Sequence, residues 1–122
     1  MNGASVLIIE DDKWLAENYV RVLTKAGYKT TIALHAISAI QLIDKDLPDA
    51  IILDVLLTGS TAFALLHELQ SYGDTGDIPV ILCTSLASDL SLSKLSDYGV
   101  KRILDKTTMI PSDLLTSLKA VL

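Results

Sequence analysis

Residues Asp49–Asp54 read DAIILD, a run of four apolar side chains that ends in a carboxylate. A short, unbroken apolar run is typical of a parallel strand that is buried on both faces of its sheet. Further strands are expected at Ser5–Ile9, at the more polar segment Lys29–Leu34, at Pro79–Thr84 and at Val100–Leu104. The buried run therefore predicts the central strand of a parallel sheet, with the other segments arranged around it.

The segments between these strands have helical periodicity. Apolar residues recur on one face of Lys13–Ala26, and Gly27 is a suitable stop for that helix. The other expected helices lie around Ile37–Ile43, over Ala62–Tyr72, over Ser88–Tyr98 and over Pro111–Leu122. Strict alternation of strands and helices predicts an α/β fold, a doubly wound five-stranded parallel sheet with helices on both faces and right-handed crossovers.

Length and composition limit the kind of protein. The chain has 122 residues, half of them hydrophobic, with a mean hydropathy of +0.44, so we expect residues 1–122 to form a single domain rather than two. Its apolar runs are much shorter than a membrane span, its first residues have no basic signal region, and Cys83 has no second cysteine to pair with. These features predict a soluble, cytoplasmic protein with no membrane partner.

The charge balance argues against one class of partner. The chain has 10 basic and 15 acidic side chains, for a net charge of −5. A nucleic-acid-binding protein usually has a basic patch, and the sequence contains none. Direct binding of nucleic acid is therefore not expected.

Polar side chains follow the predicted strands. They are Glu10, Asp11 and Asp12 after the first strand, Asp54 at the end of the third, Thr84 at the end of the fourth and Lys106 after the fifth. Parallel strands bring their carboxyl ends to one edge of the sheet, where ligands bind in such folds. Crowded carboxylates repel one another and favour a cation, and Mg²⁺ prefers oxygen ligands with a phosphate. A nearby lysine adds the charge that phosphoryl transfer needs.

With these residues in place, the chain resembles the receiver domain of two-component response regulators over essentially its whole length. The resemblance rests on the cluster Glu10–Asp12, on Asp54, on Thr84 and on Lys106, whose order and separations match that family. It implies a flavodoxin-like (βα)5 receiver fold, similar to that of the chemotaxis regulators. It also implies a signalling switch rather than a turnover enzyme.

The resemblance implies a role for each matching residue. Asp54 would accept a phosphoryl group from a phosphohistidine of a sensor histidine kinase or histidine phosphotransfer protein, and a downstream output protein or domain would respond. Asp11 and Asp54 would bind Mg²⁺ directly, with Glu10 acting through water and the carbonyl of Leu56 completing the ligand set. Thr84 would donate a hydrogen bond to a phosphoryl oxygen, and Lys106 would form an ion pair with the phosphoryl group.

Other interpretations stay open for the same residues. An acidic triplet before a helix can serve only as an N-terminal cap, since anions are favoured there. The sequence also departs from the family at Ile103, where an aromatic side chain is usual, and at Thr107, where proline is usual. These departures favour an alternative in which the chain is a receiver-like interaction module that does not switch. Because a cis bond before a non-proline residue is costly, we expect a trans bond between Lys106 and Thr107.

The sequence lacks the signatures of a third class of protein, a small enzyme or cofactor carrier of similar architecture. The loop after the first strand is acidic rather than hydroxyl-rich, which is unfavourable for the phosphate of a bound flavin. Asp54 is not followed by the second acid of an Asp-x-Asp phosphatase motif, because Leu56 stands at that position. The glycine-rich phosphate-binding motifs of nucleotide-binding proteins are also absent.

Overall fold

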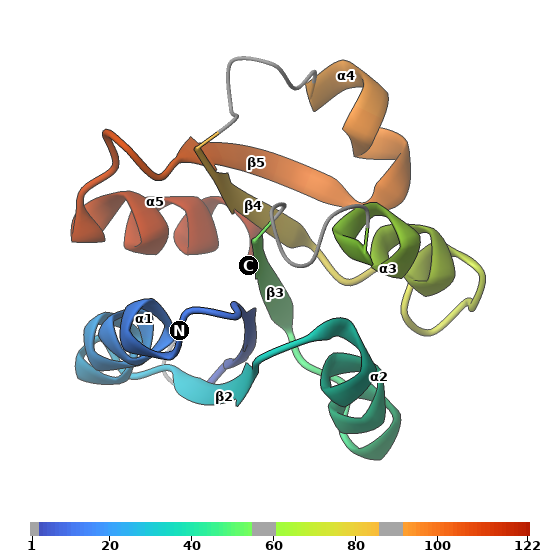
Figure 1. Cartoon of the computed structure of the whole chain (residues 1–122), viewed down its shortest axis with the longest axis horizontal. Coiled ribbons are helices and arrows are strands. Elements are labelled where there is room, and N and C mark those ends of the chain that lie inside the picture. The colour runs from blue at the N-terminus through green and yellow to red at the C-terminus, as the bar shows by residue number, and fades with distance from the viewer. Residues whose placement is uncertain (1–2, 55–60, 86–91) are drawn as a thin grey trace.

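Five parallel strands form one sheet in the computed structural model (Figure 1), which describes residues 3–54, 61–85 and 92–122 and only the backbone of residues 61 and 62. Their bounds are β1 (Ser5–Ile9), β2 (Lys29–Ala33), β3 (Ala50–Asp54), β4 (Val80–Thr84) and β5 (Val100–Asp105). The strand order is β2-β1-β3-β4-β5, and each neighbouring pair is parallel. The predicted doubly wound parallel sheet is confirmed, with β3 at its centre.

Helices cover both faces of this sheet. They are α1 (Lys13–Lys25), α2 (Ala36–Lys45), α3 (Thr61–Gln70), α4 (Leu92–Leu95), which continues as the 3-10 turn η2 (Ser96–Tyr98), and α5 (Pro111–Val121). Figure 1 shows α1 and α5 on one side of the sheet and α2, α3 and α4 on the other. Within the described residues, none of these helices has the length and apolar character required to cross a membrane.

Alternation of side chains along the strands produces two cores. Val6 and Ile8 on β1 pack with the α1 and α5 side, whereas Leu7 and Ile9 pack with the α2 and α3 side. All five residues of β3 are buried, because this strand has neighbours on both edges and helices on both faces. Burial on both faces explains why its sequence is apolar without alternation.

Two glycines end helical segments, and Gly27 does so as the sequence predicts. Gly27 after α1 has a φ of 98°, and Gly99 after η2 has a φ of 83°, a left-handed conformation that favours glycine. The helix expected over Ser88–Tyr98 differs in its described part, where regular α-helix gives way to a tighter 3-10 turn before Gly99. Such tightening is common in a last turn, where the amide of Gly99 donates to the carbonyl of Ser96.

Candidate functional site

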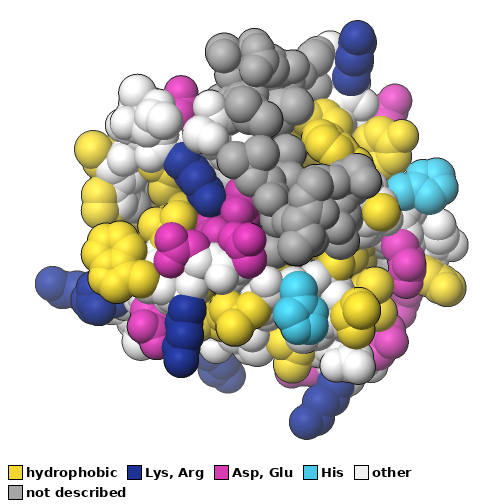
Figure 2. Space-filling model, in the orientation of Figure 1, with side chains coloured by type: hydrophobic (Ala, Val, Ile, Leu, Met, Phe, Trp, Pro, Cys, Tyr) yellow, Lys and Arg dark blue, Asp and Glu magenta, His cyan; other side chains and the backbone are white. Residues whose placement is uncertain are grey.

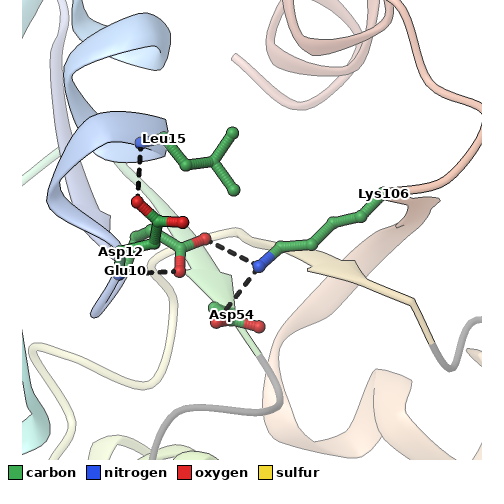
Figure 3. A network of polar contacts seen from close by, with 5 residues as sticks. All are labelled: Glu10, Asp12, Leu15, Asp54 and Lys106. Atoms are coloured by element: carbon green, nitrogen blue, oxygen red, sulfur yellow. Dashed lines mark hydrogen bonds and ion pairs between the residues drawn. The ribbon is translucent and has the colours of Figure 1, made fainter.

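The acidic triplet after β1 divides between two tasks. Asp12 is the N-cap of α1, where its Oδ1 accepts a hydrogen bond of 3.1 Å from the amide of Leu15. Glu10 is only 1% exposed, and its Oε2 accepts a hydrogen bond of 3.3 Å from the amide of Asp12. The capping interpretation is therefore right for Asp12, and Glu10 faces the inside of the sheet edge (Figure 3).

Lys106 joins the ends of two central strands. Its Nζ lies 2.8 Å from Oε1 of Glu10 and 3.1 Å from Oδ2 of Asp54 (Figure 3). Glu10 and Asp54 are nearly inaccessible, whereas the Lys106 side chain keeps 18% of its surface exposed. One ammonium group therefore faces two buried carboxylates, and this part of the site keeps an excess of negative charge when both are ionised.

The surroundings of Glu10 and Lys106 shift both of their pKa values. The pKa of Glu10 is raised to about 7, mainly by burial, with Lys106 opposing the rise and the nearby Asp54 adding to it. Burial by itself lowers the pKa of Lys106, but the adjacent Glu10 and Asp54 together outweigh burial and raise it. The lysine is therefore a permanent cation at neutral pH, and Glu10 is the group whose charge changes near neutrality.

This raised pKa predicts a pH dependence of stability in the absence of metal. Since Glu10 has a usual pKa of 4.5 and a folded pKa of about 7, the folded chain holds a proton that the unfolded chain has lost between these values. The free energy of unfolding should therefore fall by about 2–3 kcal/mol as pH rises from 5 to 7.5, and then level off. Urea denaturation in EDTA measures this slope. The slope should flatten in Glu10→Gln, and an equal slope in both proteins would contradict the assignment.

Three carboxylates at this edge can hold a cation. One carboxylate oxygen each from Glu10, Asp11 and Asp54 lies within 4.8 Å of the others. Asp11 is exposed, so the carboxylate cluster formed by these three residues opens to solvent on one side. A small set of carboxylate oxygens with room for water is the donor set that Mg²⁺ prefers. The fourth expected ligand, the carbonyl of Leu56, lies outside the described residues.

Thr84 reaches the same edge from β4. It is fully buried, and its carbonyl oxygen accepts a hydrogen bond of 2.9 Å from the amide of Lys106. This bond fixes the main chain of Lys106 beside the end of β4, so that the side chain can extend toward Glu10 and Asp54. Thr84 and Lys106 are thus brought to the edge where the sequence places them.

The loop after β5 holds a contact that the sequence analysis missed. The amide and hydroxyl of Thr107 donate hydrogen bonds of 2.8 and 2.6 Å to Oδ1 of Asp105. These bonds lower the pKa of the Asp105 carboxyl. An aspartate two residues before a hydroxyl side chain was the available signal, because aspartate side chains commonly accept from the backbone two residues on. Thr107 thus closes a turn where the family usually has proline, and the bond that precedes it is trans, as expected.

Two further side chains have structural roles. Cys83 lies opposite Asp54 in the pairing of β3 with β4, and burial raises the pKa of its thiol to about 12. The thiol therefore stays protonated at neutral pH, in agreement with the expected core role. Ile103 on β5 is half-buried and packs against the core on the α2 and α3 side.

Comparison with known proteins identifies the family. A family model for the response regulator receiver domain matches residues 6–119. The chain belongs to this family. The receiver domain is 29% identical over 117 residues to Response regulator MprA of Mycobacterium ulcerans, a match that covers 96% of this chain and 49% of that protein. The chain thus spans about half the length, or less, of the first curated relatives it matches.

Solved structures agree with the receiver fold. The chemotaxis response regulator CheY4 of Vibrio cholerae is 25% identical and superposes with a TM-score of 0.85, covering 99% of this chain and all of that one. The receiver domain of a sensor histidine kinase of Pseudomonas aeruginosa PAO1 is 21% identical, with a TM-score of 0.84 over 97% of this chain and 96% of that one. In that protein a magnesium ion is coordinated in the active-site cleft.

Proposed function

We propose that this receiver domain is a phosphoacceptor switch in which Asp54 takes a phosphoryl group from a partner's phosphohistidine. The partner would be a sensor histidine kinase or a histidine phosphotransfer protein. The observation that carries the proposal is the position of Lys106 Nζ, within 3.1 Å of Asp54 and 2.8 Å of Glu10 at a buried strand edge. This arrangement keeps the acceptor carboxylate close to a permanent cation.

The chemistry needs only a few groups. A carboxylate oxygen of Asp54 attacks the phosphorus, an oxygen–phosphorus bond forms, and the phosphorus–nitrogen bond of the phosphohistidine breaks. The electron pair of the broken bond stays on the imidazole nitrogen. Positioning and charge neutralisation dominate this kind of reaction. Lys106 would pair with the phosphoryl oxygens, and Thr84 would donate a hydrogen bond to one of them.

The carboxylate cluster would hold the metal ion. Glu10, Asp11 and Asp54 fit Mg²⁺ because their oxygens converge and Asp11 leaves the cluster open to solvent. When bound, Mg²⁺ supplies positive charge that neutralises phosphoryl oxygens. The magnesium ion in the similarly folded Pseudomonas protein supports this assignment. The Leu56 carbonyl as a further ligand stays a prediction from the sequence.

The remaining expectations follow from the switch. A phosphorylated Asp54 would change the binding of a downstream output protein or domain, and the chain would act as a switch rather than as a metabolic enzyme. The runner-up is a receiver-like module that binds partners without phosphorylation. Ile103 favours it, since the side chain that packs at this position has no ring to relocate. The single-domain span 1–122 and the cytoplasmic location stay predictions.

Phosphorylation by a small-molecule donor tests the proposal. Incubation of the purified chain with acetyl phosphate and Mg²⁺ should add one phosphoryl group, detected as a single adduct by intact mass spectrometry. Excess EDTA, added before the phosphoryl donor, should prevent the adduct from forming, because the cluster then lacks the cation that offsets its charge. A chain that binds Mg²⁺, shown separately by titration, and yet forms no adduct would favour the module that does not switch.

A further inference from the structure

A groove lies between the C-terminal ends of α2 and α3, on the side of the sheet away from α1 and α5. Its volume is about 540 Å³, within the range of natural binding pockets. Apolar side chains of Ile40 and Ile43 line it, together with Leu47 and Tyr72. Leu47 is 44% exposed and Tyr72 is 60% exposed, so an apolar surface is open to solvent here. We call this feature the α2–α3 groove.

The charges around the α2–α3 groove are almost all of one sign. Four of its lining residues are acidic and one is basic: Asp44, Asp46, Glu68, Asp74 and Lys45. Across residues 3–54, 61–85 and 92–122, none of these four carboxylates forms an ion pair with a cationic side chain. Figure 2 shows acidic side chains gathered beside apolar ones on the side of α2 and α3. The groove therefore combines an apolar floor with unneutralised negative charge.

The backbone adds to this charge. Lining residues Asp44 and Lys45 belong to the last turn of α2, and Glu68 belongs to the last turn of α3. The C-terminus of a helix carries partial negative charge from its unpaired carbonyl groups. Two such ends converge on the groove, so the preference for a cation does not depend on the carboxylates alone. The ring of Tyr72 can also stack against a guanidinium group.

We propose that the α2–α3 groove docks a basic segment of a partner protein that carries arginine or lysine side chains and at least one apolar residue. The cationic side chains would meet Asp44 and Glu68 on the two helices. The apolar residue would cover Ile40 and Tyr72. Charge complementarity selects this occupant, because an acidic or neutral segment would leave the carboxylates of the groove uncompensated.

This docking surface is independent of the phosphoacceptor site. Helices α2 and α3 run antiparallel to the strands they cover, so their C-terminal ends lie toward the amino edge of the sheet. Asp54 and Lys106 lie at the opposite, carboxyl edge. A partner held in the groove can therefore be bound both before and after phosphorylation, and the inference stands whether or not Asp54 is phosphorylated.

Chemical-shift mapping on the whole isotope-labelled chain tests the proposal. The probe is a short synthetic peptide of arginine and leucine, with a control peptide in which glutamine replaces every arginine. The first peptide should shift the amides of Asp44, Glu68 and Tyr72. Reversing one charge with Glu68→Lys should weaken its binding about five- to ten-fold. The matched control Glu17→Lys, an exposed charge reversal on α1, should leave binding within about two-fold.

Three other results would contradict the proposed docking of a basic segment. Equal weakening by Glu68→Lys and Glu17→Lys, or equal binding of the glutamine peptide, would overturn the proposal. Concentration-dependent shifts in the groove without peptide would assign it to a second copy of this chain instead. Asp74→Lys, in the loop after α3, should weaken binding in the same way as Glu68→Lys. It keeps the proposal testable if Glu68→Lys does not fold. Phosphorylation by acetyl phosphate should be unchanged in all these variants, which separates this test from that of the proposed switch.

Discussion

Replacement of Asp54 by asparagine is expected to abolish the phosphoryl adduct that acetyl phosphate forms with this chain. The amide has the shape of the carboxylate but lacks the anionic oxygen that attacks phosphorus. The adduct should therefore disappear completely rather than form slowly. Intact mass spectrometry of the wild type and of Asp54→Asn, both with Mg²⁺, measures the difference. A variant that still gains one phosphoryl group would place the acceptor elsewhere.

Two controls make the Asp54→Asn result specific. Asp12→Asn also removes an acidic charge beside the site, but asparagine caps a helix as well as aspartate does, so this variant should keep the adduct. Thermal unfolding should show that Asp54→Asn is folded, because Lys106 keeps its ion pair with Glu10 and one buried carboxylate charge is removed. Loss of the adduct in Asp12→Asn as well would assign the effect to general disturbance of the edge.

Replacement of Lys106 by methionine should have the largest effect on stability. It removes the cation that, among the residues described in the structure, pairs with two carboxylates that are 1% and 3% exposed. Removing one partner of a buried pair typically costs about 3–5 kcal/mol, because the other charge stays buried without compensation. Since Lys106 is partly exposed, we expect the free energy of unfolding to fall by about 2–4 kcal/mol at pH 7.5 in EDTA. Urea denaturation measures this change.

Restoring stability to Lys106→Met with protons or Mg²⁺ would distinguish repulsion between carboxylates from lost packing as the cause of its instability. If repulsion between Glu10 and Asp54 causes the loss of stability in Lys106→Met, that loss should be smaller at pH 5.5, where one of the two carboxylates takes up a proton. It should also be smaller after addition of Mg²⁺. Lys101→Met is the matched control, since Lys101 is an exposed lysine on β5, the strand that directly precedes Lys106. This control should change stability by no more than about 0.5 kcal/mol. A loss in Lys106→Met that neither proton nor metal reduces would indicate lost packing instead.

The sequence predicts most of the fold because burial constrains it strongly. The run of β3 is apolar along its whole length, and each further strand is followed by a helix with one apolar face, so few arrangements bury all of these surfaces. The edge residues Glu10, Asp54 and Thr84 could be predicted for the same reason. Strand order and direction determine where strand ends meet, even when the residues are far apart in the chain.

Other features depend on exposed residues, whose identity is weakly constrained. The sequence alone could not decide that Asp12 caps α1 while Glu10 and Asp11 belong to the carboxylate cluster, since all three are acids before a helix. The Asp105–Thr107 contact and the convergence of Asp44 with Glu68 also escaped prediction. They depend on the conformation of one loop and on how two helix ends approach each other. Neither leaves a periodic signal in the sequence.

The Lys106 side chain extends from the outer strand of the sheet to its centre. Its backbone directly follows β5, an outer strand, and its amide donates a hydrogen bond to Thr84 of β4, whereas its ammonium pairs with Asp54 at the end of β3 and with Glu10 just after β1. The side chain therefore links the main chain beside the outer strand β5 to the ends of the central strand β3 and its neighbour β1. We therefore expect a change of charge at Asp54 to act, through the Lys106 side chain, on the main chain at the end of β5.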